Sequence, residues 1–421
     1  MTEHAHRLRR DILWNLAPVV LLAGVGLGMN FLIGTAWGAE ALGAFNLVTT
    51  ALFAFAVLGA AGLQFAVLRA IAERPDDPDR VAAVVVGALV PAVGFAAAST
   101  AAFVLLRGVL GDMLGSPAVT TGIAWAAPGL FCFALNKVLL GVVNGLRRMR
   151  AFAVYTSVRY LLIAGALAAA LVSGMPGPRL PVIWSIAEGA LLVVLAVETL
   201  ASVRRGRAHG WRAWTARHLD YGLRGVLATL AYEVNTKLDV WMLGMALPDG
   251  PVGIYSLASA LFEGALQLSI VLQANVNPLI ARHLARGEVT EVERLVRGQR
   301  RWFVPVVVGC CAIGAASYPV IIPWLIGDPA FAAGAAPFAI LMGGVALTSP
   351  WLPFNQLLLM AGHPGWHTIY VVGVVLSAYV ANLLLIPPLG LVGAALGAGG
   401  ALVVSAVTVR ALGRVIAGVR L

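Results

Sequence analysis

Charged residues are scarce in this sequence. Only 11% of its 421 residues are Asp, Glu, Lys or Arg, whereas 60% are hydrophobic and the mean hydropathy is +0.89. A soluble domain keeps roughly a quarter of its residues charged, because its surface must face water. The composition therefore excludes a soluble enzyme or binding domain and predicts a protein whose surface mostly faces lipid.

Cysteines and nucleotide-binding motifs are also few or missing. Cys132, Cys310 and Cys311 lie in apolar runs, and their spacing suits neither a metal site nor a disulfide framework. No G-x-x-x-x-G-K-[ST] sequence occurs, which excludes an ATP-binding P-loop. The loops predicted on the outer side are too short to hold the catalytic residues of a membrane glycosyltransferase or ligase. We therefore expect neither an enzyme nor a tightly bound cofactor.

Long apolar runs fill most of the chain. One transmembrane helix needs about 20 apolar residues to cross a hydrocarbon core about 30 Å thick. The sequence has room for about twelve such helices, which predicts an all-α polytopic membrane protein. The predicted spans are 12–34, 44–70, 81–106, 119–144, 153–173, 181–203, 223–247, 253–278, 302–325, 336–361, 367–386 and 392–412.

Arginine is distributed very unequally between the two predicted sides of the membrane. Twenty-two arginines fall in segments on the side of the N-terminus, against only Arg107 and Arg179 on the other. Loops rich in Arg and Lys stay in the cytoplasm. We expect a cytoplasmic (inner) membrane protein with both termini in the cytoplasm. The net charge of +10 then reflects topology, and nucleic acid is not an expected partner.

The chain divides into two halves of six predicted spans each. The polar, basic loop at 204–222 separates them. A weak repeat supports the division, because Gly43-Ala44-Phe45-Asn46-Leu47 opens the second span and Gly253-Ile254-Tyr255-Ser256-Leu257 opens the eighth. A six-span unit begins and ends on the same side, so two copies must be parallel repeats. We predict six-helix lobes at 1–210 and 211–421, related by a pseudo-twofold axis along the membrane normal, with the substrate between them.

The only two lysines of the chain, Lys137 and Lys237, lie inside predicted spans. Ionisable residues are costly in lipid and mark functional positions by default. Glu233 lies one helical turn before Lys237, so the two can form an ion pair, and Asp239 follows on the other side of the same helix. A helix with two polar faces is expected to line a cavity or to lie between other helices.

Further ionisable residues lie inside other spans. Arg69 and Arg159 are close enough to span ends for their side chains to reach the interface, whereas Glu188 and Glu263 lie deeper. Two interpretations remain open. These groups form either a structural network of buried pairs or a hydrated passage with cationic anchors for an anionic substrate.

Five stretches resemble the polysaccharide and O-antigen flippases of the multidrug/oligosaccharidyl-lipid/polysaccharide flippase superfamily. They are ALGAFNL (41–47) continuing through LGAAGLQFAVLRAIAE (58–73), LDVWMLGMAL (238–247) with VGIYSLASALF (252–262), NPLIARHLARGE (277–288), MAGHPGW (360–366), and NLLLIPPLGLVGAALG (382–397). The order and spacing of these stretches match the family over nearly the whole chain.

The resemblance implies a flippase that moves an undecaprenyl-diphosphate-linked oligosaccharide from the inner to the outer leaflet by alternating access. Without a nucleotide site, a proton or sodium gradient would drive it. Membrane lipids and polysaccharide assembly proteins are the expected partners. The candidate substrate-binding residues are Lys237, Lys137, Arg69 and Arg159, and the candidate ion-coupling residues are Asp239, Glu233 and Glu263. The alternative is a cation-coupled exporter of the multidrug and toxin extrusion type.

Overall fold

The chain is helical throughout the part described by the computed structural model. The model describes the backbone of residues 2–204 and 206–421, and the side chains of 21, 24–201, 203, 204, 206–224, 226, 229, 230, 233, 237–273 and 275–421. Its helices are α1 (Thr2–Ala60), α2 (Leu63–Glu73), α3 (Pro78–Leu105), α4 (Arg107–Met113), α5 (Pro117–Gly145), α6 (Met149–Val172), η1 (Gly177–Arg179), α7 (Val182–Val203), α8 (Trp211–Thr236), α9 (Leu238–Ala246), α10 (Asp249–Ala285), α11 (Val289–Ile326), η2 (Pro329–Gly334), α12 (Ala335–Thr348), η3 (Leu352–Phe354), α13 (Leu357–Met360), α14 (Pro364–Leu389) and α15 (Leu391–Ile416).

Ten helical stretches of the described chain are long and apolar enough to cross a membrane. This confirms a multi-pass, all-α membrane protein. The predicted count of about twelve differs in two places. The first two predicted spans both lie in α1, whose backbone leaves the helical region at Gly38, and the predicted span 223–247 is divided between α8 and α9. The twelve-span count and the division into lobes at 210/211 stay predictions.

The contacts divide the chain into two compact units. The first unit consists of residues 1–37 and 44–237, and the second of residues 38–43 and 238–421. Each unit is described by itself below.

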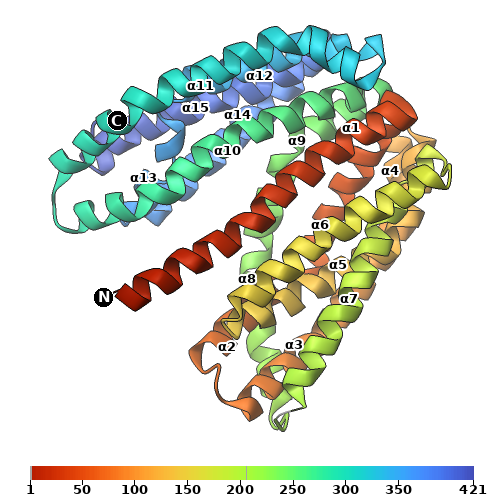
Figure 1. Ribbon diagram of the computed structural model, residues 1–421, viewed down its shortest axis with the longest axis vertical. Coiled ribbons are helices and arrows are strands. Elements are labelled where there is room, and N and C mark those ends of the chain that lie inside the picture. Colours follow the sequence, from red (N-terminus) through yellow and green to blue (C-terminus); the bar gives the residue numbers. More distant parts are fainter. Residues whose placement is uncertain (1, 205) are drawn as a thin grey trace. The chain divides into compact units, whose positions relative to one another are not determined.

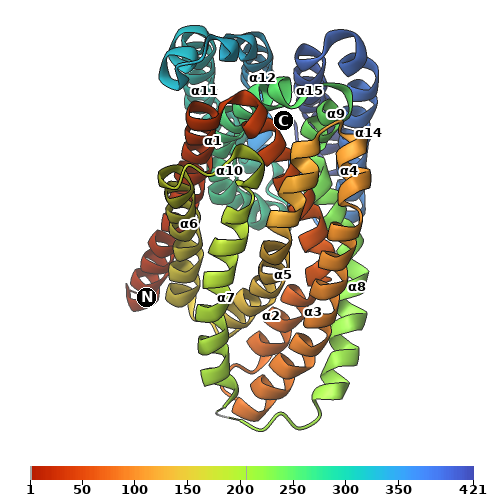
Figure 2. The same cartoon turned by 90° about the vertical axis from the view of Figure 1, so that its right-hand side faces the viewer.

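Helix α5 is the centre of the first unit. It packs against α2, α3, α6 and α7, and α8 packs against α2 and α3 (Figure 2). Small side chains allow the backbones to approach closely, which is the main way that helices associate in lipid. A Cβ at Gly141 of α5 would lie only 2.6 Å from the carbonyl oxygen of Gln64 in α2. Only glycine fits at this crossing.

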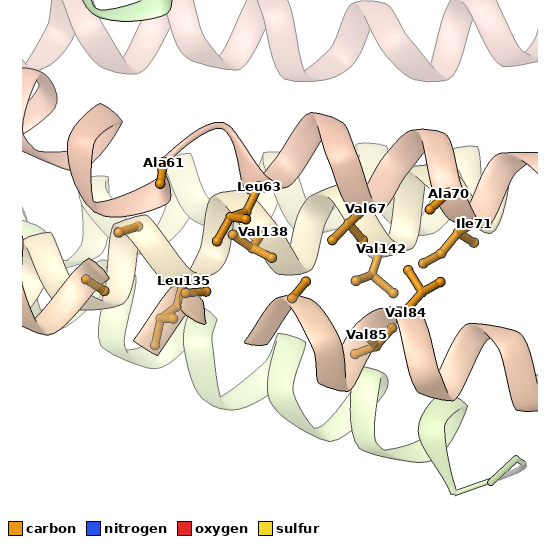
Figure 3. Close-up of a cluster of buried hydrophobic side chains, with 14 of the residues drawn as sticks. Ala61, Leu63, Val67, Ala70, Ile71, Val84, Val85, Leu135, Val138 and Val142 are labelled. Atoms are coloured by element: carbon orange, nitrogen blue, oxygen red, sulfur yellow. The ribbon is translucent and has the colours of Figure 1, made fainter. Parts of the chain in front are cut away.

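A core of short apolar side chains fills the space between α2, α3 and α5. Figure 3 shows Leu63 and Val67 of α2 facing Val138 and Val142 of α5, with Val84 of α3 beside them. These five side chains are at most 1% exposed. The core therefore fixes the packing of α5 against α2 and α3, and α5 carries the candidate site residue Lys137.

In the second unit, long helices run side by side. Helix α15 packs against α12 and α14, and α12 packs against α10 and α11 (Figure 1). The short helix α9 packs against α10, α14 and α15. The neighbours of α9 matter because it begins next to Lys237 and carries Asp239.

Two predicted spans are interrupted. The span 44–70 is interrupted where α1 ends at Ala60, before two residues with positive φ, Ala61 and Gly62. The backbone of α1 also leaves the helical region at Gly38, between the first two predicted spans. The predicted span 223–247 is interrupted at Lys237, between Thr236 and Leu238. Interrupted helices at membrane depth are tolerated only where protein surrounds them or where they line a water-filled cavity.

Candidate functional site

A buried ion pair links α6 and α7 in the first unit. Glu188 of α7 is fully buried, and its Oε1 lies 2.9 Å from Nε of Arg159 in α6. Asn136 of α5 donates hydrogen bonds from Nδ2 to Oε2 of Glu188 at 2.8 Å and to its backbone carbonyl at 2.9 Å. Three helices therefore hold one carboxylate. A buried carboxylate needs such partners, because an unpaired charge in a low-dielectric interior is very costly.

Two of the predicted substrate-binding cations meet at one aromatic ring. The Nζ of Lys137 lies 5.2 Å from the centroid of the Phe133 ring, and the Cζ of Arg159 lies 4.8 Å from it. Lys137 follows Phe133 by one turn of α5. Phe133 also stacks on Phe53 of α1, with ring centroids 5.3 Å apart. An aromatic face stabilises a partly desolvated cation, so the Phe133 ring stabilises both positive charges.

The charges of this cluster balance formally. Glu233 of α8 and Glu188 are the carboxylates that interact electrostatically with Lys137, and Arg159 is its cationic neighbour. We call Lys137, Arg159, Glu188 and Glu233 the four-charge cluster. Two cations and two carboxylates leave no formal net charge. An incoming anion would therefore have to compete with the protein's own carboxylates.

A second cluster lies in the second unit around Tyr255 of α10. The fully buried Tyr255 donates a hydrogen bond to Oδ2 of Asp239 at 2.6 Å. The backbone N–H of Val240 donates to Oδ1 of Asp239 at 2.9 Å, in the first turn of α9. Glu263 of α10 also interacts electrostatically with Tyr255. Two of the predicted ion-coupling carboxylates therefore share one tyrosine neighbour.

Lys237 occupies a distinctive place in the chain. It lies between the last residue of α8 and the first residue of α9, and the two compact units meet in sequence between it and Leu238. Because the helix is already interrupted at Lys237, the backbone there can change conformation without breaking the hydrogen bonds of a continuous helix.

Arg69 contacts a different set of residues from Lys137 and Arg159. Its Nε lies 3.8 Å from Oε1 of Glu73, and its Cζ lies 5.4 Å from the centroid of the Tyr221 ring. The side chain is 65% exposed. The structure thus brings together Lys137, Arg159 and Glu233, and separately Asp239 and Glu263.

Four residues of these clusters were not among the predicted site residues. Asn136 could have been predicted from the sequence, because it is a polar amide next to Lys137 inside an apolar run. Glu188 is recognisable as a carboxylate inside a predicted span. Phe133 and Tyr255 carry no such signal, because aromatic residues are common in membrane helices and only the packing shows which of them contact a charge.

The sequence matches the model of the polysaccharide biosynthesis protein family over residues 8–283. This chain belongs to that family. No curated protein matches the sequence significantly.

Solved structures with a similar fold include a lipid II flippase and a MATE family transporter. The lipid II flippase MurJ in an inward closed conformation is 12% identical, with a TM-score of 0.73, over 94% of this chain and 86% of that chain. An inward-facing multidrug resistance MATE family transporter of the MOP superfamily is 15% identical, with a TM-score of 0.77, over 97% of this chain and 98% of that chain. A MOP superfamily transporter from Pyrococcus furiosus, described as having a binding pocket of reverse polarity, is 14% identical, with a TM-score of 0.58, over 97% and 95% of the two chains. At these identities the likeness shows the fold that the chain shares with these proteins.

Proposed function

We propose that this protein is a flippase that moves an undecaprenyl-diphosphate-linked oligosaccharide from the inner to the outer leaflet of the cytoplasmic membrane. The observation that carries the proposal is the pair of cations, Lys137 and Arg159, at the ring of Phe133 inside the first unit. A diphosphate cannot enter hydrocarbon unless other groups replace its water, and cationic donors do so with strong hydrogen bonds. Membership of the polysaccharide biosynthesis family supports the substrate class.

The four-charge cluster also suggests how substrate binding is coupled to an ion. The cluster is formally neutral when it is empty, so a diphosphate adds negative charge to it. Uptake of a proton or a sodium ion restores the balance, and the carboxylates are the groups that can take it up. We propose Glu233 as the ion-coupling carboxylate of this cluster, and Asp239 and Glu263 as further ion-coupling residues in the second unit. Moving one charge through a membrane potential is worth about 2.3 kcal/mol per 100 mV.

Lys237 is proposed as a further anchor for the headgroup. Its place between α8 and α9 supports this role, because the chain passes from one compact unit to the other at this point. A change in the backbone conformation there would move both the ammonium group and the segment that joins the units. Alternating access needs such a link between substrate contact and conformation.

A cation-coupled exporter of the multidrug and toxin extrusion type is the second candidate. The cluster of Asp239, Glu263 and Tyr255 favours it, because two carboxylates interact with the same buried tyrosine. An organic cation would bind such a site, whereas a diphosphate would be repelled.

Transport by the purified protein in proteoliposomes distinguishes the two candidates. A flippase should move a fluorescent lipid-linked oligosaccharide when a proton or sodium gradient is imposed, and ATP should have no effect. Lys137→Gln should abolish this movement. Gradient-driven uptake of ethidium without any movement of the lipid-linked sugar would instead establish the exporter. Flipping that required ATP and no gradient would reject the proposed coupling.

A further inference from the structure

A hollow of ≈ 300 Å³ lies in the first unit where α2, α3 and α8 meet. Its lining comes from α2, from the first turn of α3 and from the N-terminal half of α8, on the side predicted to be cytoplasmic. Its lining residues are Ala66, Arg69, Ala70, Glu73, Arg80, Trp214, Arg217, His218 and Tyr221. We call it the α2–α3–α8 pocket.

Three guanidinium groups in this pocket lie over two aromatic rings. The Cζ atoms of Arg80 and Arg217 lie 5.1 Å and 4.9 Å from the centroid of the Trp214 ring. Arg69 lies over the Tyr221 ring. Guanidinium groups placed in this way on aromatic faces keep their in-plane N–H donors available for an acceptor at the ring edge. Planar forks of this kind match phosphate oxygens.

The pocket already accommodates one carboxylate between two of the arginines. Glu73 accepts a hydrogen bond from Nη2 of Arg80 at 2.5 Å, and it lies near Arg69. Three arginines and one glutamate leave two positive charges in excess. The buried Nε–H of Arg80 donates to no acceptor among the described residues. Both the excess charge and this donor are suited to a larger anion.

The walls of the pocket are held by close helix packing. A Cβ at Gly87 of α3 would lie 2.7 Å from the carbonyl oxygen of Trp211 and 2.8 Å from Cβ of Trp214 in α8. Thr215 of α8 donates a hydrogen bond to the carbonyl of Gly87 at 2.8 Å. His218 is buried, stacks on Trp214 and lies 3.2 Å from the carbonyl of Val84. The arginines are therefore presented on a pre-formed surface.

The residues of this pocket are separate from the four-charge cluster. Neither Lys137 nor Arg159 lines it. Its place near the ends of three helices, with exposed arginine and aromatic side chains, is typical of contacts with lipid headgroups at the cytoplasmic surface.

We propose that the α2–α3–α8 pocket binds the phosphate headgroup of an anionic glycerophospholipid of the cytoplasmic leaflet. Arg80 and Arg217 bind the phosphate oxygens, Arg69 adds charge at the entrance, and Glu73 competes with the phosphate for Arg80. The lipid chains remain in the bilayer. This site is additional to the proposed transport site, and it does not depend on the transported substrate.

Binding of phosphatidylglycerol to the purified, delipidated full-length protein tests the proposal, with native mass spectrometry as the readout. Arg217→Gln and Arg80→Gln should each weaken binding about fivefold, which corresponds to one interfacial cation. Glu73→Gln should strengthen it, because the internal competitor for Arg80 loses its charge. A variant that simply folds less well would bind phosphatidylglycerol more weakly, so the increase in affinity expected for Glu73→Gln cannot result from misfolding.

Arg212 provides the matched control. It lies on α8 and contacts a tryptophan in the same way, with its Cζ 5.5 Å from the Trp211 ring, but it does not line the pocket. Arg212→Gln should leave phosphatidylglycerol binding unchanged. If Arg212→Gln and Arg217→Gln weakened phosphatidylglycerol binding equally, the lipid would be attracted by the general positive charge of the surface, and the proposed site would be rejected.

The source of the phosphate is tested by two further ligands. Phosphatidylcholine, whose headgroup has no net charge, should bind more weakly than phosphatidylglycerol and should be insensitive to Arg217→Gln. Free pyrophosphate at the same concentration should not displace phosphatidylglycerol. Displacement by pyrophosphate would identify a site for a soluble anion and would reject the lipid. None of these measurements involves transport, so their outcome is independent of the flippase proposal.

Discussion

Gly43 of α1 and Gly253 of α10 approach each other reciprocally. A Cβ at Gly43 would lie 2.9 Å from the backbone nitrogen of Gly253, and a Cβ at Gly253 would lie 2.8 Å from that of Gly43. The same Cβ atoms would lie 1.9 Å and 2.0 Å from the carbonyl oxygens of Asp249 and Ala39. Each glycine thus contacts the residue four positions before its counterpart. The two helices therefore cross at backbone contact distance, with a glycine from each at the crossing.

Adding a methyl group at either glycine should separate the two helices. We expect Gly43→Ala and Gly253→Ala to destabilise the protein by similar amounts, about 1–3 kcal/mol each, because the new carbon overlaps backbone atoms that cannot move aside. The melting temperature in detergent measures the loss. Gly250→Ala is the matched control on α10, since its Cβ would lie 3.6 Å from Glu40, an ordinary contact distance. A stable Gly253→Ala protein would contradict the close approach.

Removing one member of the Arg159–Glu188 pair should destabilise the protein more than removing both. Arg159→Met leaves a fully buried carboxylate without its counterion, which costs about 3–5 kcal/mol. The double variant Arg159→Met/Glu188→Leu should recover most of the lost thermal stability, because apolar side chains of similar size replace a buried pair at little cost. Flipping should be lost in both variants. A fully active double variant would show that the pair is only structural.

Lys237→Ala should abolish flipping while expression and melting temperature stay near those of the unchanged protein. Lys237→Arg should retain partial activity, because the charge remains and its geometry changes. If Lys237 serves only as a structural partner of a carboxylate such as Glu233, Lys237→Ala should instead lower stability, and Glu233→Ala/Lys237→Ala should restore it. Full transport by a stable Lys237→Ala protein would remove this residue from the site.

The predicted topology can be tested with single cysteines in a variant that lacks Cys132, Cys310 and Cys311. A membrane-impermeant thiol reagent should not label His209→Cys in intact cells, because the loop at 204–222 is predicted to be cytoplasmic. Arg179→Cys should be labelled, since the exposed Arg179 lies on the predicted outer side. Strong labelling of His209→Cys would overturn the orientation.

The turn between α10 and α11 should loosen at low pH. A hydrogen bond from Nδ1 of His283, 2.6 Å from Oε2 of Glu288, holds the pKa of Glu288 below its usual range. The folded-state pKa is thus lower than the unfolded one. The stabilisation of the turn by this contact is fully present above the unfolded-state pKa of Glu288, about 4.3. It is lost as the pH falls through the lower folded-state pKa of Glu288. Amide exchange at Glu288, corrected for its intrinsic pH dependence, should rise in that window. It should not change with pH in Glu288→Gln.

The membrane class and the location of most helices could be predicted from the sequence. Apolar runs of span length have few alternatives, because only a helix satisfies its own backbone hydrogen bonds in lipid. Lys137, Arg159 and Glu233 were also predictable as candidates, since an ionisable residue in an apolar run stands out without any structure. The family resemblance was confirmed by the match to the polysaccharide biosynthesis model.

The partners of those residues were decided only by the tertiary structure. Arg159 and Glu188 are 29 residues apart in sequence, and Phe133 became a shared contact of two cations only when α5 and α6 packed together. The interruption at Lys237 was also not predictable, because the sequence there contains neither glycine nor proline. Hydropathy along the chain reports which residues enter the membrane. It contains no information about which helix faces meet, because that depends on small differences in packing between surfaces of almost equal polarity.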